Sequence, residues 1–209
     1  MYENVLYRDI VARYNIRNET PLKELLHFLV SNISKPHSYN SLKKVIGVAN
    51  SETVKEYISY FENSYLVFTI NKFDYSVRKQ LANPKKIYFI DNALANSVSF
   101  GFSENKGRQL ENLVFIEIRR KYREIFYHSD KHECDFLVFD NGKAIQAIQV
   151  SWSIENEKTY EREVNGLIEA METHYLKEGL ILTYDDEKEI NIDNKTIKVV
   201  PVWKWLLAE

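Results

Sequence analysis

The stretch of residues 132–152, HECDFLVFDNGKAIQAIQVSW, constrains the fold more than any other part of the chain. Two short apolar runs, 134–139 and 144–150, flank an Asn141-Gly142 pair, which tolerates the positive φ that a tight hairpin needs. Both runs are rich in β-formers and apolar on both faces, so they predict two central strands of a sheet. Asp135 begins the first strand, where a buried carboxylate must be paired or bound to a cation. Asp135 is therefore the first candidate functional residue.

Composition bounds the class of protein. The 209 residues are 44% hydrophobic and 28% charged, which is typical of a folded chain of one or two domains. The net charge of −2 means that any contact with nucleic acid must come from a local basic patch. A single cysteine, Cys134, excludes an intramolecular disulfide and argues against a zinc cluster. No signal peptide or long apolar segment is visible, so we expect a cytoplasmic protein without a membrane partner, of open oligomeric state.

The first half of the chain has the pattern of a winged helix-turn-helix domain, which we place at residues 1–95. Apolar residues at helical spacing follow Thr20, the expected N-cap, and a short helix at 41–46 precedes a third helix that begins at Asn50 or Ser51. Two strands, 66–70 and 87–90, would form the wing. In such domains the third helix normally enters a DNA groove.

Charge argues against groove recognition by this third helix. Its expected exposed face carries Glu52, Glu56 and Glu62 against Lys55 alone, and carboxylates repel phosphates. The wing supplies the candidate nucleic-acid-binding residues: Lys72, Arg78, Lys79, Lys85 and Lys86. Contact with duplex DNA through the wing and use of this domain for protein contacts both remain open.

The second half, residues 96–209, follows a polar connection at 92–106. Periodicity predicts the order α-β-β-β-α-β, with a helix from Gly107, strands at 125–128, 134–139 and 144–150, a helix at 159–175 and a strand at 179–183. A further strand is expected at 197–200, after a turn-rich acidic stretch. Glu111 lies on the first of these helices, while Asp135 and Gln149 lie on adjacent strands.

This order of elements and polar residues resembles the PD-(D/E)XK nuclease superfamily. The resemblance implies that a helix Glu, a strand Asp and an acidic residue two positions before a Lys hold Mg²⁺ and orient the attacking water. The matching positions here are Glu111, Asp135, Gln149 and Ser151, the four candidate catalytic residues. Gln149 follows Asp135 by 14 residues, enough for one strand, a tight turn and the return strand.

Two of these positions depart from the superfamily pattern. Gln149 removes one charge from a metal site and Ser151 removes the ammonium group. Glu133, two residues before Asp135, is an alternative ligand on the same strand face, so the candidate metal ligands are Glu111, Asp135 and Glu133. Lys158 is an alternative amine. We expect a degenerate site with little cleavage, and a metal-dependent nuclease is the alternative.

Several short motifs extend the resemblance over nearly the whole chain. They are YRDI at 7–10, SETVKEY at 51–57, KIYFID at 86–91, GRQLEN at 107–112, ECDF at 133–136 and PVW at 201–203. Together they resemble the C-terminal region, including the domain of unknown function 4143, of bacterial and archaeal AAA-type ATPases. That family usually carries Glu-Val-Lys where this chain has Gln149-Val150-Ser151.

The resemblance implies an ATPase domain that precedes such a region. None of the six glycines lies in a G-x-x-x-x-G-K-[ST] loop, so these residues provide no ATP site, and we expect a fragment or a product without its motor. Mg²⁺ is the one cofactor that the pattern implies. Three functions remain open: a DNA-associating or regulatory module of an ATPase, a stand-alone nuclease, and a protein-interaction scaffold.

Overall fold

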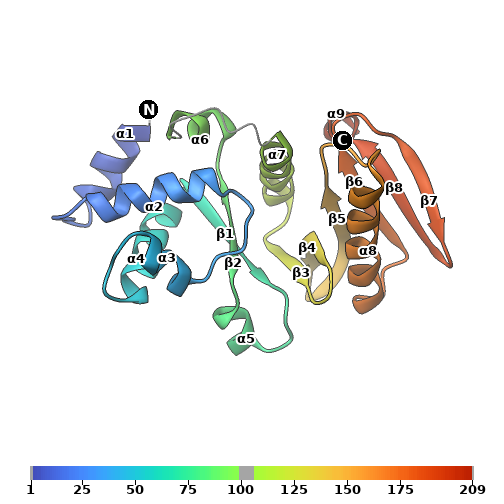
Figure 1. Ribbon diagram of the computed structural model, residues 1–209, viewed down its shortest axis with the longest axis horizontal. Coiled ribbons are helices and arrows are strands. Elements are labelled where there is room, and N and C mark those ends of the chain that lie inside the picture. The colour runs from blue at the N-terminus through green and yellow to red at the C-terminus, as the bar shows by residue number, and fades with distance from the viewer. Residues whose placement is uncertain (1, 99–105, 209) are drawn as a thin grey trace. The chain divides into compact units, whose positions relative to one another are not determined.

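A computed structural model describes residues 2–98 and 106–208, and it is a mixed α+β protein (Figure 1). Its strands are β1 (Val67–Lys72), β2 (Lys85–Phe89), β3 (Glu124–Ser129), β4 (Glu133–Asp140), β5 (Lys143–Val150), β6 (Glu178–Thr183), β7 (Lys188–Ile192) and β8 (Lys195–Pro201). Within the described residues, strands β3 to β8 form a mixed sheet in the order β3-β4-β5-β6-β8-β7, and β1 lies beside β2. The predicted central position of β4 and β5 is confirmed.

The helices of the described residues fall before, between and after these strands. They are α1 (Tyr2–Asn4), a π-helix η1 (Val5–Val11), α2 (Thr20–Ser31), α3 (Tyr39–Val45), α4 (Ser51–Asn63), α5 (Val77–Ala82), α6 (Asn92–Val98), α7 (Lys106–Lys121), α8 (Glu157–Thr173) and α9 (Val202–Leu207). None of them, within the stretches 2–98 and 106–208, is long and apolar enough to cross a membrane.

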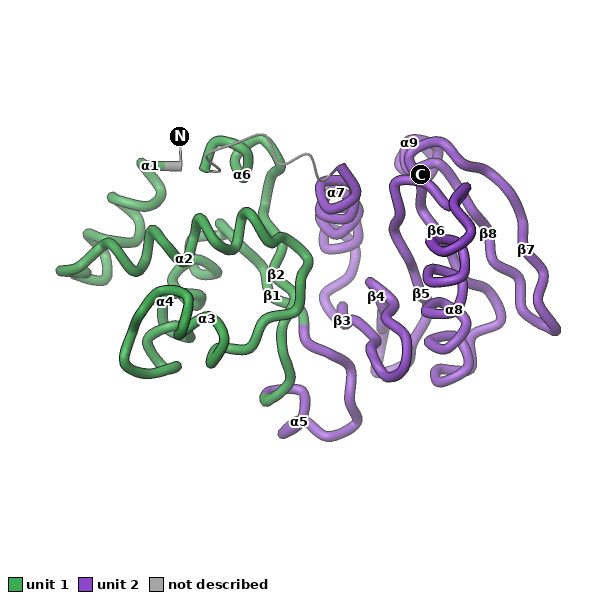
Figure 2. The backbone as a smooth tube through the Cα atoms, in the orientation of Figure 1, with its two compact units in different colours: residues 1–70, 82–105 green, residues 71–81, 106–209 purple. Residues whose placement is uncertain are grey.

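Contacts between residues divide the chain into two compact units (Figure 2). Unit 1 comprises residues 1–70 and 82–105, and unit 2 comprises residues 71–81 and 106–209. Residues 71–81, which contain most of α5, therefore belong to the same unit as α7, α8 and strands β3 to β8.

Side-chain caps fix the start of two helices of unit 1, α3 and α4. Asn50 accepts a hydrogen bond from the backbone N–H of Thr53 at 2.9 Å, which fixes the start of α4 at Ser51 as predicted. Ser38 and Ser41 form a capping box that starts α3 earlier than the expected residue 41. Thr20 is the first residue of α2 and not its N-cap, because the N-cap position belongs to Glu19.

The β4–β5 hairpin forms as the Asn-Gly pair predicted. Asn141 and Gly142 have φ of 49° and 73°, so both turn residues lie in the left-handed region. The strands pair antiparallel, with Phe136 opposite Ile148. On its other edge β5 pairs parallel with β6, which in turn pairs parallel with β8.

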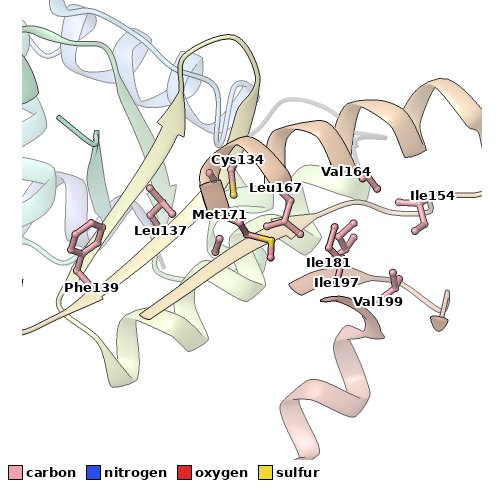
Figure 3. Packing of buried hydrophobic residues seen from close by; sticks show 12 residues of the cluster. Cys134, Leu137, Phe139, Ile154, Val164, Leu167, Met171, Ile181, Ile197 and Val199 are labelled. Carbon is pink, nitrogen blue, oxygen red and sulfur yellow. The ribbon is translucent and has the colours of Figure 1, made fainter. Parts of the chain in front are cut away.

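Helix α8 covers this part of the sheet and forms the core of unit 2. Figure 3 shows its side chains Leu167 and Met171 close to Ile181 of β6 and Ile197 of β8. All four are fully buried. Gly166 permits the close approach of α8 to β4, because a methyl group there would overlap the carbonyl oxygen of Glu133.

Three elements differ from the sequence-based expectation. The polar connection expected at 92–106 contains α6, and residues 99–105 lie outside the described residues. The acidic stretch after β6 contains β7, whose edge position requires little burial and therefore leaves a weak apolar pattern. The wing loop contains α5, none of whose residues is buried.

Candidate metal-binding site

A cavity of about 460 Å³ in unit 2 brings the predicted carboxylates together. We call it the carboxylate cavity. Helix α7 supplies Glu111, β4 supplies Glu133 and Asp135, and β5 supplies Gln149. Four of the five residues predicted for the site or as its metal ligands therefore lie around one space, although they are separated by up to 38 positions in the chain.

Asp135 joins β4 to β5 through two hydrogen bonds. Its backbone N–H donates to Oε1 of Gln149 at 2.9 Å, and its Oδ2 accepts from the backbone N–H of Val150 at 3.0 Å. The residue is only 6% exposed. The backbone N–H of Val150 holds this carboxylate in one orientation at the cavity wall, and a fixed orientation favours ligation of an ion.

Glu163 of α8 is a fourth carboxylate of the cavity, and the sequence analysis missed it. The residue is 3% exposed, and its Oε2 accepts a hydrogen bond from Nε2 of Gln149. Its Oε1 accepts from the guanidinium of Arg162, whose Nε lies 3.2 Å away. A sequence signal for Glu163 exists: it precedes Gly166, Leu167 and Ala170 by three, four and seven positions, so it lies in the buried stripe of α8.

The electrostatics of the cavity favour a cation. Burial raises the pKa of Glu163 above its usual range, and the negative charge of Asp135 raises it further. Hydrogen bonds from Arg162 and Gln149 oppose these effects without cancelling them. Asp135 and Glu163 are buried carboxylates of a cavity that Glu111 and Glu133 also line, and carboxylate oxygens are the ligands that a hard divalent ion such as Mg²⁺ or Mn²⁺ prefers. Among the described residues, these four do not form a group whose ligand atoms all lie within 4.8 Å of one another, so the side chains would have to converge on the ion.

Gln149 acts as a positioning residue in this arrangement. Its amide oxygen is occupied by the backbone N–H of Asp135, and its amide nitrogen faces Glu163. The charge that Gln149 removes from the superfamily pattern is therefore matched by the charge of Glu163 from α8. The predicted role of Gln149 as a catalytic residue stays a prediction.

The ammonium group of the superfamily pattern has no direct substitute at the predicted positions. Ser151 is buried, its hydroxyl donates to the carbonyl of Ser153 at 3.0 Å, and it does not line the cavity. Lys158 is exposed near the start of α8 and does not line the cavity either. Arg162 is the cation that joins Glu163 there, and its pKa is raised by its hydrogen bond to Glu163, so it is no proton acceptor.

Burial corrects the predicted basic patch of the wing. Lys85 and Lys86 lie in β2 and are 7% and 1% exposed, so neither can meet a phosphate on the surface. Lys72 forms an ion pair with Asp130 at 2.9 Å. Arg78 and Lys79 on α5 are exposed. The candidate patch is thereby reduced to α5 and the partly exposed Lys72.

The exposed face of α4 also differs from the expectation. Glu52 and Glu56 are exposed, but Glu62 is partly buried and turned toward β1. Its Oε1 accepts hydrogen bonds from the backbone N–H and the hydroxyl of Thr69, at 3.1 and 2.6 Å. Two carboxylates therefore face solvent, and not three.

A second group of possible ligands lies between β3 and α8. The ligand atoms of His128, Asp130 and Glu169 lie within 4.8 Å of one another. Glu169 already accepts hydrogen bonds from His128 and from the backbone N–H groups of Lys131 and His132. Together with the Lys72–Asp130 ion pair, these hydrogen bonds indicate that the group stabilises the β3–β4 turn.

Comparison with known proteins places the chain in a family. The model of a domain of unknown function, DUF8612, matches residues 1–106, just over half of the chain. The chain belongs to the DUF8612 family. A second domain of unknown function, DUF4143, matches residues 106–205 of this DUF8612 protein. The carboxylate cavity lies wholly within the DUF4143 match.

Relatives of this DUF8612 protein are longer than the chain itself. The uncharacterized protein MJ1544 of Methanocaldococcus jannaschii is 37% identical over 99% of the chain and 48% of its own length. An uncharacterized protein of Haemophilus influenzae is 26% identical over 99% of the chain and 51% of its own length. The chain thus spans about half the length of the curated relatives that it matches. No solved structure matches it.

Proposed function

We propose that this chain is the non-motor C-terminal region of an AAA-type ATPase family protein, and that it associates with nucleic acid through a metal-binding, nuclease-like domain. The length of the relatives supports this, since each has room for a further domain about as long as the chain. The proposal also requires that residues 1–95 form a winged helix. The succession α2, α3, α4, β1 and β2 supports that assignment.

The domain of residues 96–209 is proposed to have the PD-(D/E)XK nuclease-like fold. The succession α7, β3, β4, β5, α8 and β6 is the order expected of that superfamily, and Glu111, Asp135 and Gln149 line one cavity. The observation that carries the functional proposal is Glu163. It supplies a buried carboxylate beside Asp135, in a cavity where Gln149 supplies none.

The roles of the residues follow from their contacts. Asp135, Glu163 and Glu111 would hold a divalent ion, which, when bound, polarises a phosphodiester and lowers the pKa of water. Gln149 holds Asp135 and Glu163 in position, and Arg162 offers a guanidinium that suits a phosphate oxygen. No ammonium group at Ser151 orients the water, and a lost electrostatic group of this kind costs about a hundred- to a thousand-fold in rate. We therefore propose metal binding with slow cleavage at most.

Calorimetric titration of Mn²⁺ and Mg²⁺ into the full chain tests the metal site. Asp135→Ala and Glu163→Gln should each weaken binding about tenfold or more, because each removes a ligand charge. Glu161→Gln is the matched control, since Glu161 is an exposed carboxylate on the same helix that does not line the cavity. Absence of metal binding to the unmodified chain would reject the site.

A nuclease assay on duplex and single-stranded DNA with Mn²⁺ or Mg²⁺ then separates a weak site from an active one. Rapid cleavage by the unmodified chain that Asp135→Ala abolishes would show an active nuclease and contradict the slow rate proposed here.

Protein contact is a second candidate function for unit 1. The observation that favours it is the exposed acidic pair Glu52 and Glu56 on α4, which suits a basic protein surface better than DNA.

A further inference from the structure

Unit 2 contains another cavity, of about 510 Å³, that the proposed function does not use. We call it the aromatic cavity, since its lining includes the rings of Phe73, Phe126, Phe139 and His174. Phe73 stacks on Phe139 with ring centroids 4.7 Å apart, and the rings of Phe73 and His174 lie nearly perpendicular with centroids 4.8 Å apart. These rings support one another in fixed orientations and form a preorganised apolar wall.

His174 gives this wall a polar atom that no group in the described part of the chain satisfies. Its Nε2 is buried and has no hydrogen-bond partner among the described residues. Burial lowers the pKa of His174 to about 4. The neighbouring His128 lowers this pKa as well, whereas Asp130 raises it. The imidazole is therefore neutral at pH 7, and Nε2 can donate or accept one hydrogen bond according to its tautomer. A ligand with a polar ring edge would satisfy this atom.

Two tyrosines at the border of the aromatic cavity are almost fully exposed. Tyr75 is 83% and Tyr175 is 92% exposed, and both line the cavity. Tyr175 has φ of 59°, directly after the C-cap of α8, a position that favours glycine. Neither its backbone conformation nor its packing accounts for an aromatic side chain there. Exposed tyrosines beside a preformed aromatic wall are suited to stacking against a flat ring.

The charges around the aromatic cavity select against an anion. Asp74 and Glu124 line it together with a single lysine, Lys143. Lys79, which lies 3.8 Å from Asp74, neutralises part of this charge without making the cavity basic. A neutral, planar ligand is thus favoured over a phosphate. The volume lies within the range of small-molecule sites and is ample for a purine.

We propose that the aromatic cavity binds a nucleobase-like heteroaromatic ring, stacked on Tyr175 and the phenylalanine wall and hydrogen-bonded to Nε2 of His174. The ring belongs either to a free nucleoside or to an unpaired base of a single strand. Both sources present the same chemistry, a π-face with polar ring atoms at its edge. The cavity shares no lining residue with the carboxylate cavity, so the proposal does not depend on metal binding.

Calorimetry with the full chain in EDTA tests this site with three probes: adenosine, a single-stranded adenylate hexamer, and benzyl alcohol. The expected result is saturable binding of adenosine, of the hexamer or of both, at least about tenfold tighter than that of benzyl alcohol, which has a ring without nitrogen. Binding of the hexamer alone identifies an unpaired base as the ligand. Failure of both adenine probes to bind, or equal binding of benzyl alcohol, overturns the proposal.

Two variants locate the site. His174→Phe keeps a ring in the wall but removes Nε2, and Tyr175→Gly removes the stacking ring while relieving the backbone. Each should weaken binding about fivefold or more, which corresponds to one ordinary hydrogen bond for His174→Phe and to the low end of base–aromatic stacking for Tyr175→Gly. Tyr65→Gly is the matched control: Tyr65 is 71% exposed, has φ of 54°, follows the C-cap of α4 and does not line the cavity. Unchanged affinity in both test variants overturns the assignment.

A direct readout is the imidazole ¹⁵N spectrum, in which the His174 signals are identified by their loss in His174→Phe. Adenosine or the hexamer should shift these signals. The ligand should shift them by the same amount in the Asp135→Ala variant as in the unmodified chain. Absence of metal binding to the unmodified chain, with base binding retained, would reject the carboxylate cavity as a metal site and leave the aromatic cavity unaffected. An unchanged His174 signal at saturating ligand would reject the proposed hydrogen bond and with it this site.

Discussion

At the scale of single residues, Gln149 decides how the carboxylate cavity is built. Its amide group spans from the backbone of Asp135 to the carboxylate of Glu163, so one neutral side chain positions two charged ones. A glutamate at position 149 would add a third negative charge to this buried pair. The neutral amide therefore agrees with a cavity that already contains enough carboxylates for one divalent ion.

Glu163→Gln should stabilise the metal-free chain by about 1 kcal/mol. The pKa of Glu163 is raised in the folded state, so its ionised form lowers stability at neutral pH, and a neutral amide removes that cost. Urea unfolding at pH 7 measures the difference. In EDTA the free energy of unfolding should be larger for the variant than for the unmodified chain. Millimolar Mn²⁺ should stabilise the unmodified chain more than the variant. The reverse order in EDTA would contradict the repulsion inferred here.

Because of His174, we expect the folded chain to lose stability in weak acid. Its pKa is lowered from 6.5 to about 4 in the folded state, so the unfolded chain binds a proton first as the pH falls. Stability should therefore decrease from pH 6.5 to pH 4, by about 1–2 kcal/mol after allowance for the partial exposure of the ring. His174→Gln should be less sensitive than the unmodified chain over this interval. Urea titrations at several pH values measure the free energy of unfolding. If this free energy changed with pH equally in the variant and in the unmodified chain, the result would count against the buried neutral imidazole.

At the scale of elements, α8 contributes to several parts of unit 2. Its apolar stripe forms the core with β6 and β8 (Figure 3). Glu163 lines the carboxylate cavity, and His174, directly beyond the end of the helix, lines the aromatic cavity. The position of α8 relative to β4 is set by Gly166. A displacement of this helix would therefore change both the position of Glu163 and the packing of the core.

Gly166→Ala should destabilise the chain by about 3 kcal/mol, since the added methyl group overlaps the backbone of Glu133 and must push α8 away from β4. Metal binding should weaken as well, because Glu163 moves with the helix. Asn165→Ala is the matched control on the neighbouring position, which is exposed. The control should be neutral or slightly stabilising by helix propensity. Equal thermal unfolding of the two variants would show that the approach of α8 to β4 is not tight.

Elements were predicted well where local chemistry decides them. Asn50 and the Asn141-Gly142 turn place α4 and the β4–β5 hairpin by hydrogen bonds and dihedral angles that lie within a few residues. Edge strand β7 and the short helices α5 and α6 were missed. The short helices bury few or no residues and β7 lies at the edge of the sheet, so their apolar patterns are weak.

At the scale of the whole molecule, association with DNA is expected to depend on a few surface charges. Of the five predicted basic residues, Arg78 and Lys79 are exposed, Lys72 is partly exposed, and Lys85 and Lys86 are buried. The net charge of −2 provides no general attraction. Binding to duplex DNA should therefore be weak, and the slope of log affinity against log salt should be no steeper than about −3, because at most three cations can meet phosphates.

Arg78→Glu combined with Lys79→Glu should reduce the slope of log affinity against log salt by about 2, because each substitution leaves one DNA phosphate without its cation. Lys177→Glu is the control, as an exposed lysine outside the predicted patch. Fluorescence anisotropy with a labelled duplex at several salt concentrations gives the slopes. A response of affinity to salt that is flat, or unchanged by the double substitution, would remove α5 from the DNA-binding surface.

The sequence by itself determined the local structure and the identity of the residues around the carboxylate cavity on β4, β5 and α7. Apolar periodicity predicted the order of these elements, and the resemblance to the PD-(D/E)XK superfamily pointed to Glu111, Asp135 and Gln149 on them. Only the tertiary structure decided that Glu163 joins them, that Lys158 and Ser151 do not, and that Lys86 is buried. Periodicity specifies which face of an element is buried, whereas the packing of buried faces that are far apart in the chain depends on tertiary structure, which no local pattern records.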